Sequence, residues 1–386
     1  MVLENPLTPA LRFPEFSGEW EEKPFTSLGE FRGGGTPDTS IEHYWSGNIP
    51  WISSSDIEED NLHTIHTNRF ITKIAVKESA TKIIPSNSIL LISRVGVGKL
   101  AVTLQELCTS QDFTNFTPKK DNVFFIAYWL LRHKVKLISL SQGTSIKGFT
   151  IKDINLLKLP LPTLPEQQKI ASFLTAVDAR IAHLQQKHTL LQTYKKGLMQ
   201  QLFSQALRFT QPNGSPYPAW EDSVLGKHCN ITTGALDANA MVINGIYPFF
   251  TCARDVYRIN TPAFNTEALL ISGNGANVGY IHYYNGQFNA YQRTYVLDAF
   301  KHNIQFVKHY LHQHLKKRIF SEVKEGNTPY IVMGTLSKMS ISFPHPEEQQ
   351  KIAACLSAVD AKISLTAQAI QHAQAFKKGL LQQLFV

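Results

Sequence analysis

The sequence EQQKIASFLTAVDARI at residues 166–181 returns almost unchanged as EQQKIAACLSAVDAKI at residues 348–363. The offset of 182 residues (348 − 166) holds without a gap through KKGLMQQLF and KKGLLQQLF, which begin at Lys195 and Lys377. Of the 39 aligned positions that start at Glu166 and Glu348, 22 are identical. Two copies are too few for a solenoid, in which each repeat stacks on its neighbours. The pattern indicates an internal duplication.

Both copies have the apolar spacing of a long helix. Apolar residues recur in alternating steps of three and four, and polar residues such as His188, Lys195 and Lys377 occupy only a few of these seam positions. Such a pattern, sustained over about four heptads, favours a coiled coil. The apolar seam consists of Leu174, Val177, Ile181, Leu184, Leu191 and Leu198 in the first copy and Leu356, Val359, Ile363, Ile370, Leu380 and Leu384 in the second.

Each helix should run for about 38 residues, or about 57 Å. The sequence from Thr163 to Glu166 can form a capping box at the start of the first one. Helices of this length should pair with each other. The alternative is an ordinary amphipathic core helix, but a narrow seam with Gln- and Lys-rich flanks suits the coil better. Gly197 and Gly379 indicate either a helix end or the close approach of another backbone.

Two larger segments separate the helices, and they resemble each other faintly. In both, β-rich runs lie between Gly, Asn and Pro turns, and LLISRVG at 90–96 aligns with LLISGNG at 269–275. Each also has one helical run, at 124–137 and 305–320. The predicted fold class is therefore α+β, with two similar mixed α/β globular domains. We divide the chain into a first head (1–162), a helix (163–205), a second head (206–344) and a second helix (345–386).

The order head, helix, head, helix is cyclic, because the ALRF motif that follows the first helix at 206–209 also precedes the first head at 10–13. If a pseudo-two-fold axis relates the halves, the helices run antiparallel and act as a ruler between two inverted heads. Heads that keep a framework but differ in sequence should bind two different targets. Duplex DNA has the approximate two-fold backbone symmetry that suits this arrangement.

Composition narrows the class of partner. The chain has 386 residues and a formal net charge of +8, and a basic surface favours nucleic acid. No run approaches the roughly 20 apolar residues of a membrane helix, and the first residues lack the layout of a signal peptide. Four scattered cysteines without a CxxC pair suit a reducing compartment. We expect a cytoplasmic protein with no membrane partner.

With these motifs in hand, the chain resembles the specificity (S) subunit of type I restriction–modification systems. The resemblance rests on EQQKIA-x-x-L-x-x-VDA-[RK]-I, which follows a P-x-P sequence in both copies, and on KKGL-x-QQLF, each present twice after a head of target-recognition size. Framework within the heads, such as IPWISSSDI and LLISGNGANVGYI, extends it over nearly the whole chain. The resemblance implies that each head is a target-recognition domain that reads one half of a bipartite, asymmetric DNA site.

The same resemblance implies partners. The helices would set the unread spacer and dock modification (methyltransferase) subunits, which carry S-adenosylmethionine and methylate adenine N6. A restriction (endonuclease/translocase) subunit would bring ATP and Mg²⁺. The chain itself would be non-catalytic and bind no cofactor or metal.

Motifs for chemistry are absent or weak. There is no [DN]-P-P-[FY] tetrad of an adenine methyltransferase, and Gly96-Val-Gly-Lys99 lacks the remainder of a P-loop. A nuclease cluster could be assembled from Asp298, Glu322 and Lys324, but the first head has no counterpart. The spacing of His309, His312 and His314 suggests the polar face of a basic helix rather than a metal site.

Base edges and phosphates are contacted by Arg, Lys, Asn, Gln and Ser side chains on exposed loops. Trp51 and its counterpart Phe249 should be core residues instead. The candidate DNA-binding residues are Ser53, Ser54, Ser55, Arg94, Gly96, Gly98, Lys99 and Lys147 in the first head and Arg254, Asn274, Gly275, Asn277, Gln292 and Arg293 in the second.

Three alternatives stay open at this point. The candidate loops could be plain hairpin turns with solvated charges. The chain could be a structural adaptor, a coiled coil that presents two protein-binding modules. A stand-alone nuclease ranks third.

Overall fold

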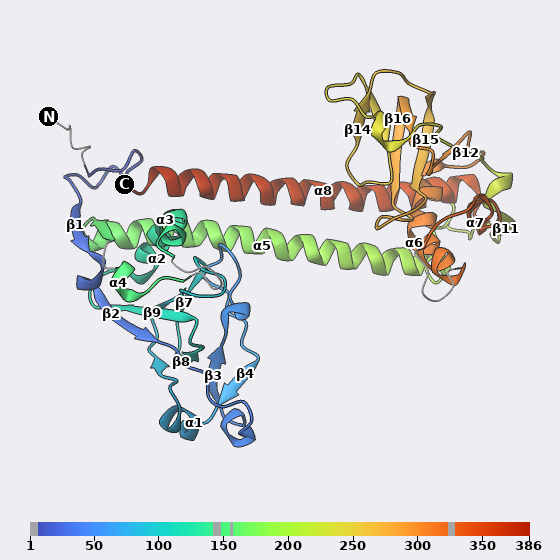
Figure 1. Ribbon diagram of the computed structural model, residues 1–386. Coiled ribbons are helices and arrows are strands. Elements are labelled where there is room, and N and C mark those ends of the chain that lie inside the picture. The colour runs from blue at the N-terminus through green and yellow to red at the C-terminus, as the bar shows by residue number, and fades with distance from the viewer. Residues whose placement is uncertain (1–6, 142–147, 155–156, 323–328) are drawn as a thin grey trace. The chain divides into compact units, whose positions relative to one another are not determined.

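The computed structural model describes residues 7–141, 148–154, 157–322 and 329–386 (Figure 1). The chain divides into two compact units, unit 1 (Met1–Gln185 and Gln368–Val386) and unit 2 (Gln186–Ala367). Each unit contains one head and part of both long helices, α5 (Leu164–Phe203) and α8 (Pro346–Gln383). The division thus cuts through the helices rather than between heads and helices. No helix within the described ranges is both long and apolar enough to span a membrane.

The head of unit 1 is built on three antiparallel or mixed sheets, β1-β10, β2-β9-β6-β7 and β4-β3-β8-β5. Its strands are β1 (Glu21–Pro24), β2 (Gly29–Gly33), β3 (Ile49–Ile52), β4 (Arg69–Ile71), β5 (Ile83–Ile84), β6 (Ser88–Ile92), β7 (Leu100–Thr103), β8 (Leu107–Thr109), β9 (Phe113–Pro118) and β10 (Lys158–Leu161). Its helices are α1 (Lys73–Glu78), α2 (Val123–Arg132), α3 (Lys134–Ser139) and α4 (Ile151–Ile154).

The head of unit 2 has a β11-β18 pair and one six-stranded sheet, β12-β17-β15-β16-β13-β14. Its strands are β11 (Glu221–Val224), β12 (Asn230–Thr233), β13 (Tyr247–Phe250), β14 (Tyr257–Ile259), β15 (Phe264–Ser272), β16 (Ile281–Ala290), β17 (Thr294–Asp298) and β18 (Ser340–Phe343). Its helices are α6 (Ile304–Glu322) and α7 (Met333–Ser337).

The two heads share one scaffold despite their different sheet counts. In unit 1, β3 pairs in parallel with β8, with Trp51 opposite Cys108. In unit 2, β13 pairs in parallel with the end of β16, with Phe249 opposite Asn289. Residues 281–288 of β16 pair antiparallel with β15, as β7 pairs with β6. The single strand β16 therefore corresponds to both β7 and β8 of unit 1. Because β16 is continuous, unit 2 has one six-stranded sheet where unit 1 has two four-stranded sheets.

Strand β6 and residues 268–272 of β15 are buried on both faces, as their apolar runs require. Ile89 and Leu91 point to the core that includes the long helices, and so do Leu269 and Ile271. Ile89 is therefore equivalent to Leu269. The sequence alignment that matched Leu90 with Leu269 is wrong by one residue, because a run that is apolar on both faces carries no signal for its register.

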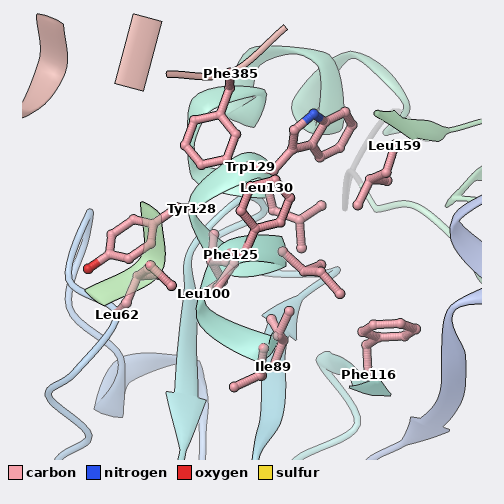
Figure 2. Packing of buried hydrophobic residues seen from close by; sticks show 14 of the residues in the cluster. Leu62, Ile89, Leu100, Phe116, Phe125, Tyr128, Trp129, Leu130, Leu159 and Phe385 are labelled. Atoms are coloured by element: carbon pink, nitrogen blue, oxygen red, sulfur yellow. The ribbon is translucent and has the colours of Figure 1, made fainter. Parts of the chain in front are cut away.

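Each head packs on both long helices. In unit 1, Leu174 of α5 and Leu380 of α8 belong to the same core as α2 and β6. Figure 2 shows Phe385 lying over Phe125, with Trp129 and Leu130 beside them on α2. In unit 2, Leu202 and Leu356 join the core of α6 and β15 in the same way. Each unit thus brings the beginning of one long helix against the end of the other, so the helices pack antiparallel.

The segments that begin each head also bind equivalently. The backbone N–H of Leu207 donates to the carbonyl of Gln201, near the end of α5 (3.1 Å). The N–H of Leu11 donates to the carbonyl of Gln383, at the end of α8 (2.9 Å). Since Gln201 and Gln383 are 182 residues apart, the cyclic order inferred from the ALRF motif has a direct counterpart in hydrogen bonding.

Candidate nucleic-acid interface

The repeated Glu of EQQ anchors each head to its helix. Arg12 binds both carboxylate oxygens of Glu166 at 2.8 Å, and Arg208 binds those of Glu348 at 3.1 and 2.7 Å. Both carboxylates are almost fully buried. A two-point guanidinium–carboxylate pair fixes orientation as well as distance, so the ALRF segment is held in one position on each helix.

The first Gln of the motif caps a helix of the head. The amide oxygen of Gln167 accepts from the N–H of Asn122 (2.9 Å), whose own side chain caps α2. The amide oxygen of Gln349 accepts from the N–H of Asn303 (3.1 Å), which bonds the N–H of Phe306 in α6. These bonds satisfy donors that a helix N-terminus leaves free. They also tie the long helix to the head within each unit.

A charge pair crosses between the long helices in each unit. Lys377 lies 2.6 Å from Asp178 in unit 1, and Lys195 lies 2.5 Å from Asp360 in unit 2. Asp178 and Asp360 occupy the same position of the repeat, and so do Lys195 and Lys377. The duplication therefore explains why the aspartate of each copy pairs with the lysine of the other. The pair in unit 1 is the more buried, with both side chains near 10% exposed against 19% and 35%.

Asp178 is held by more than Lys377. Tyr128 donates to its second oxygen at 2.7 Å, and the ring of His63 lies 3.3 Å away. Burial by itself raises the pKa of Asp178, but the hydrogen bond from His63 and the bond and charge of Lys377 outweigh burial, and the pKa is lowered. The carboxylate is therefore charged at neutral pH.

The predicted seam residues face inward. Leu174, Ile181, Leu184 and Leu198 are buried, and so are Leu356, Val359, Leu380 and Leu384. Val177, Leu191, Ile363 and Ile370 are half-buried. Gly197 and Gly379 neither end a helix nor allow another backbone to come close. Both helices continue past Gly197 and Gly379, and a Cβ built on either would meet no atom of the described residues within 4 Å.

In unit 1, a group of loops at one end of the strands carries most of the first set of DNA-binding candidates. Residues 34–36, 53–55, 93–98, 110–112 and 148 form this loop cluster 1. Backbone bonds join them: Ser110 donates to Ile52 (2.9 Å), Ser93 donates to Asp112 (2.8 Å), and Arg94 bridges Gly148.

Loop cluster 2, in unit 2, is its counterpart and comprises residues 234–236, 251–254, 273–279, 291–293 and 330–331. Tyr291 donates to Phe250 (2.9 Å), Gly273 donates to Arg293 (2.9 Å), and Asn274 bridges Tyr330. Each bond repeats one of loop cluster 1, so the structure identifies Asn274 as the counterpart of Arg94.

Within loop cluster 1, the candidates differ in availability. Ser53 is not free, because its hydroxyl bonds Asp56 (3.0 Å) and accepts from Arg69 (2.6 Å), and Asp56 also accepts from its N–H. Ser54 is half-buried, whereas Ser55 and Arg94 are exposed.

The glycines and lysines of this region have separate roles. Gly96, at φ +104°, turns the chain on the surface. Gly98 is buried, and a Cβ there would lie 3.1 Å from Ile138, so it permits packing on α3 rather than approach to a ligand. Lys99 is half-buried at the end of the loop, and Lys147 lies outside the described residues.

In loop cluster 2, Arg254, Gly275, Gln292 and Arg293 are exposed, and Asn274 is half-buried. Arg254 lies over the ring of Tyr280 at 5.6 Å. Asn277 donates to the carbonyl of Cys252 (3.1 Å) and thus joins two of the loops. Trp51 and Phe249 are buried beneath the clusters.

Three residues of the loop clusters escaped sequence reasoning, Thr36, Gln111 and Tyr330, and so did Arg69, which donates to Ser53 of loop cluster 1. Gln111 is the counterpart of Gln292, but only the glutamine is shared between the SQD and YQR turns. Arg69 lies 4.6 Å from the ring centre of Trp51 and is 16 residues from Ser53, with no local motif to announce it. Tyr330 is 61% exposed.

The other candidate chemistry does not assemble. Glu322 accepts from Thr335 (2.7 Å) and pairs with Arg318, and Lys324 lies outside the described residues. The expectation that His309 lies on a polar face is wrong, because it is fully buried against Ser357 (3.4 Å). His312 is exposed and His314 half-buried. No three His, Cys, Asp or Glu side chains of the described residues are grouped as a metal site.

Comparison with known proteins decides the family. The sequence model of the type I restriction modification DNA specificity domain matches residues 17–193 and 219–375, so each match holds one head and most of one long helix. The chain belongs to this family. The MjaIX type I specificity subunit of Methanocaldococcus jannaschii is 27% identical over 405 residues, which cover 95% of this chain and 92% of that one.

Two further comparisons agree with this family. The EcoDI specificity subunit of Escherichia coli is 42% identical over 148 residues, 38% of this chain and 32% of that one. The type I restriction–modification S subunit of M. genitalium has the same fold, with a TM-score of 0.69 at 18% identity over 98% of this chain and 99% of that one. The predicted α+β class with two similar heads and two long helices is confirmed.

Proposed function

We propose that this chain is the DNA sequence-specificity subunit of a type I restriction–modification complex. Each head reads one half of a bipartite, asymmetric site, unit 1 through loop cluster 1 and unit 2 through loop cluster 2. The antiparallel helices set the spacer between the half-sites and dock the methyltransferase subunits. We expect the chain to act in the cytoplasm, with no membrane partner.

One observation carries the proposal. The two clusters share their backbone bonds but present different side chains, with Arg94 where the other has Asn274 and Asp112 where it has Arg293. Two domains that bind different base sequences need different polar side chains on the same backbone framework, because base pairs differ in the donors and acceptors at their edges.

The chain contributes recognition, and its partners contribute the chemistry. S-adenosylmethionine would bind the modification subunits, and ATP and Mg²⁺ would bind the restriction subunit. This division is supported by the uses that the titratable side chains already have: Glu166 and Glu348 anchor heads, and Asp178 and Asp360 pair with lysines.

The test uses the full chain, alone and with its cognate modification subunit. Alone, it should bind duplex DNA with an affinity that falls steeply as salt rises, about −0.9 in log–log slope for each phosphate contacted. With the partner, it should direct N6-methyladenine to one split, asymmetric motif, read by sequencing the methylated genome of a host that lacks other methyltransferases.

The structural adaptor is the rival function, and it predicts neither result. Salt-independent or absent duplex binding, together with a partner complex that methylates no split motif, would overturn our proposal. Methylation by the isolated chain would show instead that its chemistry is its own.

A further inference from the structure

Loop clusters 1 and 2 place a glutamine at the same point of the same turn. Gln111 lies between β8 and β9, and Gln292 lies between β16 and β17. In each turn, the residue before the glutamine (Ser110 or Tyr291) donates its backbone N–H to the last residue of β3 or β13. The residue after the glutamine (Asp112 or Arg293) accepts, at its backbone carbonyl, from the loop that follows β6 or β15. Both glutamines are exposed.

The turn that carries Gln111 is rigid. The N–H of Phe113 donates to Ser110 (3.3 Å), the hydroxyl of Ser110 donates to the carboxylate of Asp112 (3.3 Å), and Ser93 and Arg94 both donate to the carbonyl of Asp112. The side-chain oxygen of Gln111 accepts from Thr36. Its amide nitrogen has no partner among the described residues, so two donors stay available.

The turn that carries Gln292 is held as firmly. The N–H of Thr294 donates to Tyr291 (2.8 Å), and the N–H of Gln292 itself donates to Leu236 (2.8 Å). The carbonyl of Arg293 accepts from Gly273 (2.9 Å). The side chain of Gln292 forms no hydrogen bond within the described part of the chain, so its whole amide faces outward from a fixed backbone.

Four side chains around the shared glutamine differ between the clusters. A base reader on a fixed turn keeps its preference, whereas its neighbours determine which other bases fit. The equivalent pairs, given as unit 1 and then unit 2, are Thr36 and Leu236, Asp112 and Arg293, Arg94 and Asn274, and Gly148 and Tyr330.

We propose that Gln111 and Gln292 are specificity-determining residues that each read an adenine in the major groove of the half-site bound by their head. This inference rests on the proposed function. A glutamine amide offers one acceptor and a donor, which match the N6 amino group and N7 of adenine, and no other base edge presents that pair in the major groove. The remaining differences between the half-sites come from the exchanged neighbours.

The test is a pair of isosteric substitutions in the complex with the cognate modification subunit. Gln111→Glu and Gln292→Glu remove the donor and keep the acceptor, so each should lower methylation of the original motif about 10-fold or more and favour C·G at one position, because a carboxylate accepts from cytosine N4. Each variant should change one half-site only, and the two should change different ones. Gln111→Ala and Gln292→Ala should instead relax that position without a new preference.

Two exposed glutamines of the same heads serve as controls. Gln105, in the turn before β8, and Gln287, on β16, lie outside the clusters, so Gln105→Glu and Gln287→Glu should leave the motif unchanged. A wild-type complex that methylates no split motif would overturn the proposed function. A normal wild-type motif that survives Gln111→Glu and Gln292→Glu, or that changes in both half-sites at once, would overturn this inference alone.

Discussion

The lysine of KKG and the aspartate of VDA are explained by the pairs that they form. Asp178–Lys377 and Lys195–Asp360 join repeated positions, so any substitution in one copy has a matched counterpart in the other. The environments differ, because unit 1 adds Tyr128 to its aspartate, whereas unit 2 has His309 at the equivalent position of its helix. The two copies should therefore respond unequally to the same change.

Lys377→Met should destabilise unit 1 by about 3 kcal/mol, because it leaves the buried carboxylate of Asp178 without its cation. The matched Lys195→Met should cost less than about 1 kcal/mol, since Asp360 is a third exposed and water can replace the lysine. Urea unfolding followed by circular dichroism measures both.

A second substitution serves as the control for this pair. Asp178→Asn combined with Lys377→Met should regain much of the loss, because the amide still accepts from Tyr128 and no charge is buried. Equal costs for the two lysine variants, or no recovery in the double variant, would contradict the role of burial.

Burial of His309 predicts acid sensitivity. Burial, with the nearby charges of Lys195 and Lys308, lowers the pKa of His309 to about 3, although Asp360 acts in the opposite direction. The unfolded chain therefore binds a proton that the folded one does not, between about pH 6.5 and 3. The contribution of His309 to the free energy of unfolding is fully present above about pH 6.5 and declines as the pH falls.

His309→Tyr introduces the residue that unit 1 has at this position, and it should make that decline shallower by up to about 1.4 kcal/mol per pH unit. Unfolding free energies at pH 6.5, 5.5 and 4.5 give the slope, which is independent of the absolute stability of the variant. His309→Leu is a second variant without a titrating group, and the exposed His372→Tyr is the control. A slope unchanged in both His309 variants would refute the linkage.

Sequence reasoning placed Arg94 and Gly275 on exposed loops because a glycine or a repeated motif marks each loop, and their contact with DNA stays a prediction. It gave too much weight to Ser53, because a hydroxyl that caps a turn looks the same in sequence as one that faces solvent. It overlooked Gln111, because its turn is recognisable only from the backbone bonds of Ser93 and Ser110. Side-chain availability depends on such distant partners.

The long helices were predictable because heptad spacing and the repeat both report on them. The sheets were not predictable to the same degree. A strand buried on both faces has no alternation to fix its register, and the merging of two strands into β16 leaves no mark in composition. The prediction for Gly197 and Gly379 was also wrong, because each lies in a helix interior where it neither ends the helix nor makes room for another backbone.

The helix glycines should be replaceable with a gain. Gly197 is exposed and Gly379 half-buried, both have helical neighbours on both sides, and both leave space for a Cβ. Gly197→Ala and Gly379→Ala should each raise stability by up to about 1 kcal/mol, through higher helix propensity and a less flexible unfolded chain. Thermal unfolding measures the gain. Gly98→Ala is the contrasting variant and should destabilise, because its φ of +92° and the contact with α3 exclude a side chain.

The proposed function makes the paired helices a measuring device for DNA. Seven residues restore the seam almost to its original face, and they lengthen an α-helix by about 10.5 Å, close to three base pairs at 3.4 Å each. Duplicating residues 182–188 in α5 and 364–370 in α8 adds matched heptads, because these segments are 182 residues apart and contain the seam positions Leu184 and Ile370.

The complex with this double insertion should methylate a motif whose half-sites are unchanged and whose spacer is longer by about three base pairs. The insertion in α5 alone is the control: the pairs Asp178–Lys377 and Lys195–Asp360 can no longer both form, and methylation should fall for every spacer. Half-sites that change with the insertion would mean that the helices take part in reading bases. An unchanged spacer would mean that something other than helix length sets it, because the insertion alters length while leaving every contact of both loop clusters in place.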